Sequence, residues 1–121
     1  MYLLDSNIII YYADKQYDCL DAIFIEDALY VSEITRLEVL GYHRIGSLKS
    51  LFEQLFEEFS IIPISRIIID TAIFIRQQKS MSLGDAIICA SALENDLTIV
   101  TRNVKDFNWI EKLKVYNPFE D

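Results

Sequence analysis

Four acidic residues each lie near the end of a predicted strand or the start of the helix that follows it: Asp5, Glu38, Asp85 and Asp106. In a parallel sheet with right-handed crossovers these points share one edge, so the four carboxylates are expected to converge. Gathered carboxylates raise each other's pKa, and a divalent cation such as Mg²⁺ or Mn²⁺ removes their repulsion. Such ions can activate a water and stabilise the charge of a phosphodiester displacement, so the pattern predicts a metal-dependent phosphodiesterase site.

Helix capping is the alternative explanation for the same acids. Thr35-x-x-Glu38 and Ser82-x-x-Asp85 both fit the capping box, in which the acid accepts a hydrogen bond from the backbone amide of the cap residue. Asp106 could cap a helix that contains Trp109, and Asp5 could cap the helix that follows it. Each acid taken alone fits a structural role about as well as a functional one. Their common edge favours the metal site.

Alternating strands and helices must position these acids. Residues 2–4 suit a short strand buried on both faces, and Ser6 and Asn7 are good N-caps for a helix over 8–12. Further strands are predicted at 28–32, 61–64, 97–101 and 114–116, and helices at 35–44, 48–59, 66–79, 82–94 and 107–113, while 15–26 combines a loop with a helical pattern. This alternation predicts an α/β fold, a three-layer sandwich with a parallel sheet of four to five strands and Asp5 at the end of its central strand.

Several predicted helices have apolar faces, which matter for the question of whether the protein binds a partner. The cleanest amphipathic stripe is Leu48–Phe59, which more often belongs to a core than to a ligand site. In the helix over 66–79, Ile68, Ala72, Ile75 and the neighbouring isoleucines are expected to face inward. The stripe, together with the aromatic helix Ile8–Tyr12, gives more nonpolar face than one small core needs, which suggests a buried partner surface.

The composition, with 52% hydrophobic and 25% charged residues, is typical of one globular domain over residues 1–121. The net charge of −8 argues against broad nonspecific binding to nucleic acid but not against a nuclease that binds substrate through metal ions. It is also compatible with a basic protein partner. No apolar run is long enough to span a membrane and Met1–Asp5 lacks the basic start of a signal peptide, so we expect a cytoplasmic protein.

Four segments resemble the sequence motifs of PIN-domain ribonucleases. They are Leu3–Ile10, Ile34–Tyr42, Leu83–Ala92 and Ile99–Phe107, in the order of the family. A single element such as Leu-Asp-Ser-Asn has little specificity, whereas four in order over most of the chain are specific. The compact size is similar to that of the VapC-type toxins of toxin–antitoxin pairs.

The resemblance implies Mg²⁺-dependent endonucleolytic cleavage of RNA, with Mn²⁺ as an alternative ion. It makes Asp5, Glu38 and Asp85 metal-binding and catalytic carboxylates. Thr101 or Ser6 would support them. The fourth acid of the family stands two residues after the threonine in some members, where this chain has Asn103, so Asp106 is the nearest acid for that position. Possible contacts to RNA phosphates are Arg36, Arg102 and Lys105.

The resemblance also implies partners. A VapC-type toxin would form a homodimer, and a helical groove would hold a segment of a protein antitoxin that places a basic residue in the acidic site. Other functions stay open: a catalytically silent binding module or a DNA-directed nuclease on the same fold. A haloacid-type phosphatase is disfavoured because Asn7 stands where that fold needs a second acid, and a receiver domain is disfavoured because no acidic pair follows the first strand.

Overall fold

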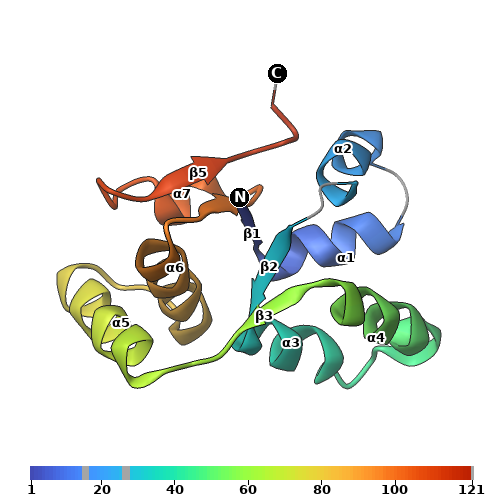
Figure 1. Cartoon of the computed structure of the whole chain (residues 1–121), viewed down its shortest axis with the longest axis horizontal. Helices are drawn as coiled ribbons and strands as arrows, with labels where there is room; N and C mark the ends of the chain where they lie inside the picture. Colours follow the sequence, from blue (N-terminus) through green and yellow to red (C-terminus); the bar gives the residue numbers. More distant parts are fainter. Residues whose placement is uncertain (15–16, 26–27, 121) are drawn as a thin grey trace.

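Five short parallel strands form the sheet at the centre of the fold (Figure 1). A computed structural model describes residues 1–14, 17–25 and 28–120. The strands are β1 (Tyr2–Leu4), β2 (Leu29–Ser32), β3 (Ser60–Ile62), β4 (Thr98–Val100) and β5 (Lys114–Tyr116). Their spatial order is β3-β2-β1-β4-β5, so β1 is central and β3, which precedes Pro63, is an edge strand. The predicted parallel sheet, with Asp5 following its central strand, is confirmed.

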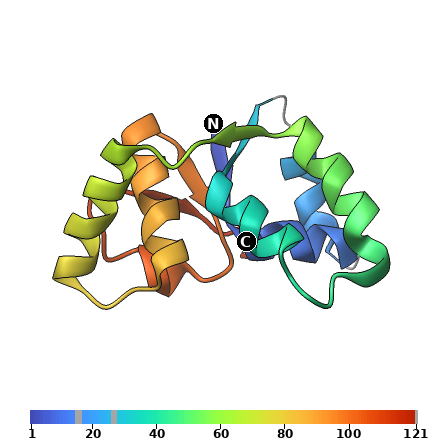
Figure 2. The same ribbon diagram turned by 90° about the horizontal axis from the view of Figure 1, so that it is seen from below.

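Helices cover both faces of this sheet, which confirms the predicted three-layer sandwich (Figures 1 and 2). The helices are α1 (Ser6–Asp14), α2 (Asp21–Phe24), α3 (Glu33–Leu40), α4 (Lys49–Glu58), α5 (Arg66–Gln78), α6 (Leu83–Asn95) and α7 (Val104–Phe107), with 3-10 turns η1 (Asp18–Leu20) and η2 (Gly46–Leu48). One core lies between the sheet and α5, α6 and α7, and the other between the sheet and α1, α2 and α4. Adjacent residues of β1 face opposite cores: Leu3 belongs to the first and Leu4 to the second.

Several predicted helix ends shift. The helix after β1 begins at Ser6, so Ser6 and Asn7 lie in its first turn and are not its caps. The helix predicted over 35–44 is α3, which begins earlier and ends at Leu40. Of the region 15–26, residues 18–24 are helical, while residues 15, 16 and 26 lie outside the described part of the chain.

Two capping predictions were wrong. Ser32 caps α3 by accepting a hydrogen bond from the backbone amide of Ile34 at 3.1 Å, so Thr35 lies inside the helix and is fully buried. The helix predicted over 107–113 is replaced by α7, which ends at Phe107. Asp106 therefore lies inside α7 and does not cap a helix containing Trp109.

The apolar residues of α4 and α5 are only partly buried in the core as predicted. The stripe of α4 belongs largely to the core, because Phe52 and Phe56 are buried. In α5, Ile68, Ala72 and Ile75 are buried as expected. The neighbouring isoleucines are not, since Ile67 is 64% and Ile73 51% exposed. Among the described residues, no helix combines the length and apolar character needed to cross a membrane.

Candidate active site

The carboxyl edge of the sheet brings the predicted acids together from four elements. Asp5 follows β1, and its backbone amide donates to the carbonyl of Val100 at 3.0 Å, which extends the pairing of β1 with β4 by one residue. Glu38 projects from α3, Asp85 from the first turn of α6 and Asp106 from α7. Asp5 interacts electrostatically with Asp85 and Glu38, and Asp85 with Glu38 and Asp106.

Asp5 is the buried centre of this group, with 6% of its surface exposed. One carboxylate oxygen accepts a hydrogen bond from the Ser6 backbone amide, and the other accepts one from the Thr101 hydroxyl, both at 2.8 Å. Burial raises the pKa of Asp5 to about 6, opposed by these two hydrogen bonds and reinforced by the negative charges of Asp85 and Glu38. Asp5 is thus a carboxylate whose charge costs free energy in the absence of a cation.

Glu38 is held at the edge by Ser6, whose hydroxyl donates to a carboxylate oxygen of Glu38 at 2.9 Å. Its other side is bounded by Gly84 of α6. A Cβ atom at Gly84 would lie 2.9 Å from Oε2 of Glu38, closer than unstrained contacts allow. The missing side chain at position 84 therefore leaves space for the Glu38 carboxylate between α3 and α6.

Asp85 is both part of the N-terminal cap of α6 and a member of the acidic group. Ser82 is the N-cap, and its hydroxyl accepts a hydrogen bond from the Asp85 backbone amide at 3.1 Å, which confirms half of the predicted capping box. Burial raises the pKa of the Asp85 carboxyl, the Ser82 hydroxyl lowers it, and the charges of Asp106 and Glu38 raise it again. Capping thus accounts for the backbone of Asp85, and its carboxylate faces three other acids.

The remaining predicted residues occupy different places. Thr101 is fully buried and connects Asp5 with Asn103. Its hydroxyl donates a hydrogen bond to Asp5 and accepts one from the Asn103 backbone amide at 3.0 Å. Asn103 directly precedes α7, whereas Asp106 interacts with Asp85. The structure thus brings Asp106 into electrostatic contact with the acidic group.

The three cations predicted to contact phosphates differ in their surroundings. The Arg36 guanidinium forms an ion pair with Glu33 at 2.7 Å. The Arg102 guanidinium lies over aromatic rings, 4.5 Å from the ring centre of Phe119 and 5.4 Å from that of Tyr11. Lys105 lines a hollow together with Asp85 and Asp106. Their role as phosphate contacts stays a prediction, for which Lys105 has the most suitable position.

A group of acids at the carboxyl edge of a five-stranded parallel sheet agrees with the comparison of the sequence with known families. The model of the PIN domain family matches residues 2–112. The chain belongs to the PIN domain family. The match includes all four acids of this PIN domain and all four motifs that suggested the resemblance. Among curated protein sequences, none matches the chain significantly.

Solved structures of similar shape come from several bacteria. A chain of a toxin–antitoxin complex from Klebsiella pneumoniae is 30% identical, with a TM-score of 0.86 and full coverage of both chains. A chain of FitAcB from Neisseria gonorrhoeae is 25% identical, with a TM-score of 0.81 and full coverage of both. A chain of VapBC2 from Rickettsia felis, bound to a promoter DNA fragment, is 22% identical with a TM-score of 0.78, covering 96% of this chain and 97% of that one. The last likeness shows a shared fold only.

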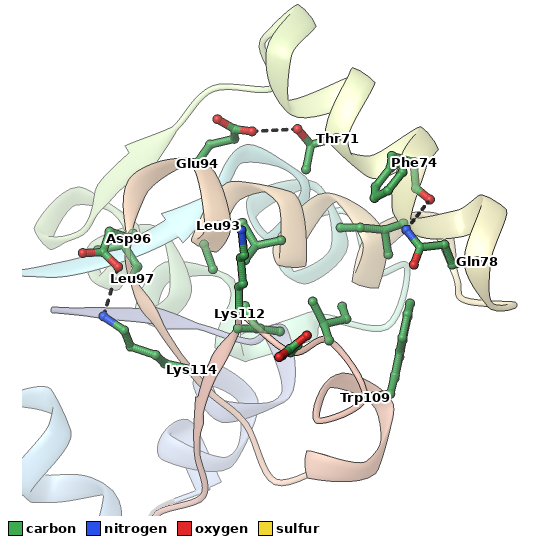
Figure 3. A pocket seen from close by; sticks show the side chains of 15 residues that line it. Thr71, Phe74, Gln78, Leu93, Glu94, Asp96, Leu97, Trp109, Lys112 and Lys114 are labelled. Atoms are coloured by element: carbon green, nitrogen blue, oxygen red, sulfur yellow. Dashed lines mark hydrogen bonds and ion pairs between the residues drawn. The ribbon is translucent and has the colours of Figure 1, made fainter.

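A large hollow of this PIN domain lies away from the acidic group. It has a volume of about 700 Å³ and lies between α5, α6 and the segment 109–114 (Figure 3). None of the four acids lines it. Its rim contains local pairs such as Lys114 with Asp96 at 3.0 Å and Thr71 with Glu94 at 2.7 Å. The size of a hollow therefore does not identify the candidate active site of this protein.

Thr101→Val is expected to destabilise the protein by about 1–3 kcal/mol at pH 7, because a buried charged acceptor loses a hydrogen-bond donor. The same change should raise the pKa of Asp5 above its present value of about 6, since the Thr101 hydroxyl holds it down. The loss of stability should shrink at pH 5, where Asp5 is largely protonated. Urea unfolding at both pH values measures this, with Thr98→Val, in the strand β4 that precedes Thr101, as the control. Equal losses at both pH values would contradict the role of Thr101.

Proposed function

We propose that this PIN domain is a metal-dependent endoribonuclease and the toxin of a type II toxin–antitoxin pair. The observation that supports the proposal most is the convergence of Asp5, Glu38 and Asp85 at one sheet edge, with the pKa of both aspartates raised. The family match and the likeness to a toxin–antitoxin chain at 30% identity point to the same function.

The donor set suits Mg²⁺ or Mn²⁺, which prefer hard oxygen ligands. Asp5 and Asp85 would hold the ion, and Glu38 and Asp106 would complete the site. Within the described residues, no three acidic, histidine or cysteine side chains are close enough to form a ready-made metal cluster. That spacing is compatible with Mg²⁺, which is usually bound by one or two carboxylates and keeps several waters. A bound ion would lower the pKa of a water and stabilise charge on the phosphate.

The protein's own side chains have separate tasks in this proposal. Thr101 and the Ser6 amide hold the Asp5 carboxylate in one orientation through opposite oxygens. The Ser6 hydroxyl holds Glu38, so α1 positions two acids at once. Lys105 lies beside Asp85 and Asp106 and would attract the phosphate that the acids alone would repel.

Cleavage of single-stranded RNA tests the proposal. The purified protein is given several defined RNAs, and single-stranded DNA of the same sequences, with Mg²⁺, with Mn²⁺ and with excess chelator. We expect internal cuts in RNA that require either ion. Cutting of DNA alone would favour the DNA-directed nuclease, and binding without cutting would favour the silent module. Cleavage that is indifferent to chelator would contradict the metal site.

Gly84→Ala is expected to separate activity from stability. The added methyl group would displace the Glu38 carboxylate, which is at the end of an exposed side chain and can move at little cost. Alanine also favours the helix by up to about 1 kcal/mol. Cleavage should therefore fall about tenfold or more while the melting temperature stays equal or rises. Full activity in a folded Gly84→Ala protein would show that the position of Glu38 is unimportant.

The protein antitoxin is proposed to bind in the groove between α1, α2 and α4. This groove has a volume of about 500 Å³ and is lined by apolar side chains that include Tyr12, Phe24 and Leu55, together with Gln54 and Glu58. Tyr12 and Phe24 stack with ring centres 3.7 Å apart. Ile25 at its margin is 79% exposed. An amphipathic segment with basic residues would match both the groove and the net charge of −8.

A second copy of the chain is proposed to pack on the outer face of α5 and the start of α6. Ile73, Phe74 and Leu83 are 51%, 63% and 65% exposed there. Ile73 and Leu83 also line one apolar hollow between the two helices. An exposed apolar face shared by two helices is typical of a homodimer interface.

Ile73→Glu is expected to convert a dimer of this 14.1 kDa chain to a monomer, because a charge would be buried in an apolar interface. Light scattering at micromolar concentration measures the mass. Ile25→Glu is the control, since Ile25 is also an exposed isoleucine and lies beside the other groove. It should leave the dimer intact. A wild-type protein that is monomeric under these conditions would contradict the proposed interface.

A further inference from the structure

A second, smaller hollow opens directly beside the acidic group. Its volume is about 310 Å³, and its walls come from the α5–α6 loop, the first turn of α6, α7 and Trp109. Asp85 and Asp106 form its acidic side, and Lys79 and Lys105 add two positive charges. Its size is at the lower end for small-ligand cavities, which suits one residue of a polymer better than a long segment.

Two of the cations near the carboxyl edge are already engaged. Arg36 pairs with Glu33, and Arg102 is placed over the rings of Phe119 and Tyr11. Lys79 and Lys105 take part in no ion pair with any residue that the structure describes. A nuclease with a net charge of −8 needs unpaired cations to hold a phosphate, and these two lysines line a hollow shared with the acids.

Trp109 provides a fixed aromatic wall for the same hollow. Its indole N–H donates to the Asp106 carbonyl at 3.0 Å, which orients the ring relative to α7. The Lys79 ammonium lies 5.5 Å from the ring centre. This contact is weak at a solvent-accessible site, so an arriving phosphate can draw the ammonium away from the ring. Figure 3 shows that Trp109 also stands at one end of the larger hollow, so it is accessible from both cavities.

We propose that this hollow binds one unpaired nucleotide of the RNA substrate, next to the phosphate that is cut. The base stacks on Trp109, and Lys79 and Lys105 contact the adjacent phosphate. Stacking on an aromatic ring requires a base that is free of its duplex neighbours, so the hollow selects single-stranded over paired RNA. The inference rests on the proposed ribonuclease function and adds Lys79 and Trp109 to its substrate-binding residues.

Tryptophan fluorescence tests this directly, because Trp109 is the single tryptophan of the chain. A short single-stranded RNA is titrated in Mg²⁺ into the Asp5→Asn protein, which is expected to leave the RNA uncut and does not alter the walls of the hollow. We expect saturable quenching of Trp109 emission. A hairpin of the same composition with no unpaired bases should quench at least tenfold less effectively.

Substitutions then separate the two contacts, with the affinity for fluorescently labelled RNA measured by anisotropy. In this background, Trp109→Ala should weaken binding about 5- to 150-fold, and Trp109→Phe, which keeps a stacking ring, should retain most of it. Lys79→Ala with Lys105→Ala should lower the slope of log affinity against log salt by about 0.7, for the one phosphate that the two lysines contact. Lys49→Ala, at the start of α4, is the control and should change neither, because α4 packs in the other core of the sheet from α5 and α6.

Cleavage by the wild-type protein is measured separately, so that the two proposals can fail independently. RNA that is cut while Trp109 emission stays constant and the lysine variants bind normally would overturn the nucleotide site and leave the ribonuclease intact. Quenching and lysine dependence without cleavage would support the nucleotide site and overturn the enzyme. Equal binding of hairpin and single strand would overturn the preference for unpaired bases.

Discussion

Asp85→Asn is expected to reduce RNA cleavage by at least about 100-fold, or about 3 kcal/mol of transition-state stabilisation, while the fold stays intact. The substitution removes a charge that the proposed ion needs. It spares the helix cap, because the bond to the Ser82 hydroxyl comes from the backbone amide of residue 85. The metal-free variant should be no less stable than the wild type, since burial and two neighbouring acids raise the pKa of Asp85.

Cleavage assays in Mg²⁺, together with thermal melts in chelator, measure both effects of this change. Asp70→Asn is the matched control because Asp70 is an exposed acid on α5, outside the acidic group. Glu38→Gln should behave like Asp85→Asn, and Asp106→Asn should have a milder effect because Asp106 acts on Asp85 but is not among the charges that raise the pKa of the buried Asp5. Full activity in Asp85→Asn would mean that this acid only caps α6.

Asp5→Asn should abolish cleavage and at the same time stabilise the metal-free protein at pH 7. The pKa of Asp5 is about 6 in the folded state against 3.8 for an ordinary aspartate. The folded state therefore binds a proton at Asp5 more tightly than the unfolded state does. As pH rises from about 4 to about 6, this difference lowers the free energy of unfolding, and the loss of stability persists above pH 6. A shift of this size corresponds to about 3 kcal/mol. Asparagine accepts from only one of the two donors, so the net gain is about 2 kcal/mol or less.

Urea unfolding in chelator at pH 4.5 and pH 7 isolates the contribution of Asp5, because the chain's other acids titrate in both proteins. The stability difference between variant and wild type should favour the variant at pH 7 and vanish or reverse at pH 4.5. A difference that is independent of pH would show that the charge of Asp5 is not the cause. Unchanged cleavage would remove Asp5 from the metal site.

The sequence predicted the position of the acids because strand ends and chain order determine it. Three apolar residues before Asp5 require a strand buried on both faces, and Leu3 and Leu4 do face different cores. Once β1 is central, the parallel order places the residues after β1 and β4 side by side, which explains the contact between Asp5 and Thr101. These relations depend on the backbone topology, which the pattern of apolar residues in the sequence can predict.

Features for which two residues or two faces were equally suitable could not be predicted from the sequence. Ser32 and Thr35 are both good caps, and only the end of β2 at Ser32 decides between them. Trp109, Ile110 and Leu113 have helical spacing, yet the chain must turn after Phe107 to lead into β5. Ile67, Ile68 and Ile69 are consecutive in α5, so either of two faces could have been the buried one.

The residues proposed to hold the substrate were also difficult to predict. Lys79 was predicted to end a helix, and Trp109 was predicted to lie in a helix over 107–113. Their only hint in the sequence is position, since Lys79 shortly precedes the Ser82 cap and Trp109 follows Asp106 by three residues. Their proximity depends on the packing of the α5–α6 loop against the segment after α7.

An anomalous difference map from crystals of the wild-type protein soaked in Mn²⁺ tests most directly whether these carboxylates form a metal site. We predict a peak within coordinating distance of the carboxylate oxygens of Asp5 and Asp85, and its loss in crystals of Asp85→Asn. The contradictory result is a protein that cuts RNA in Mn²⁺ and whose crystals show no ion at this edge of the sheet.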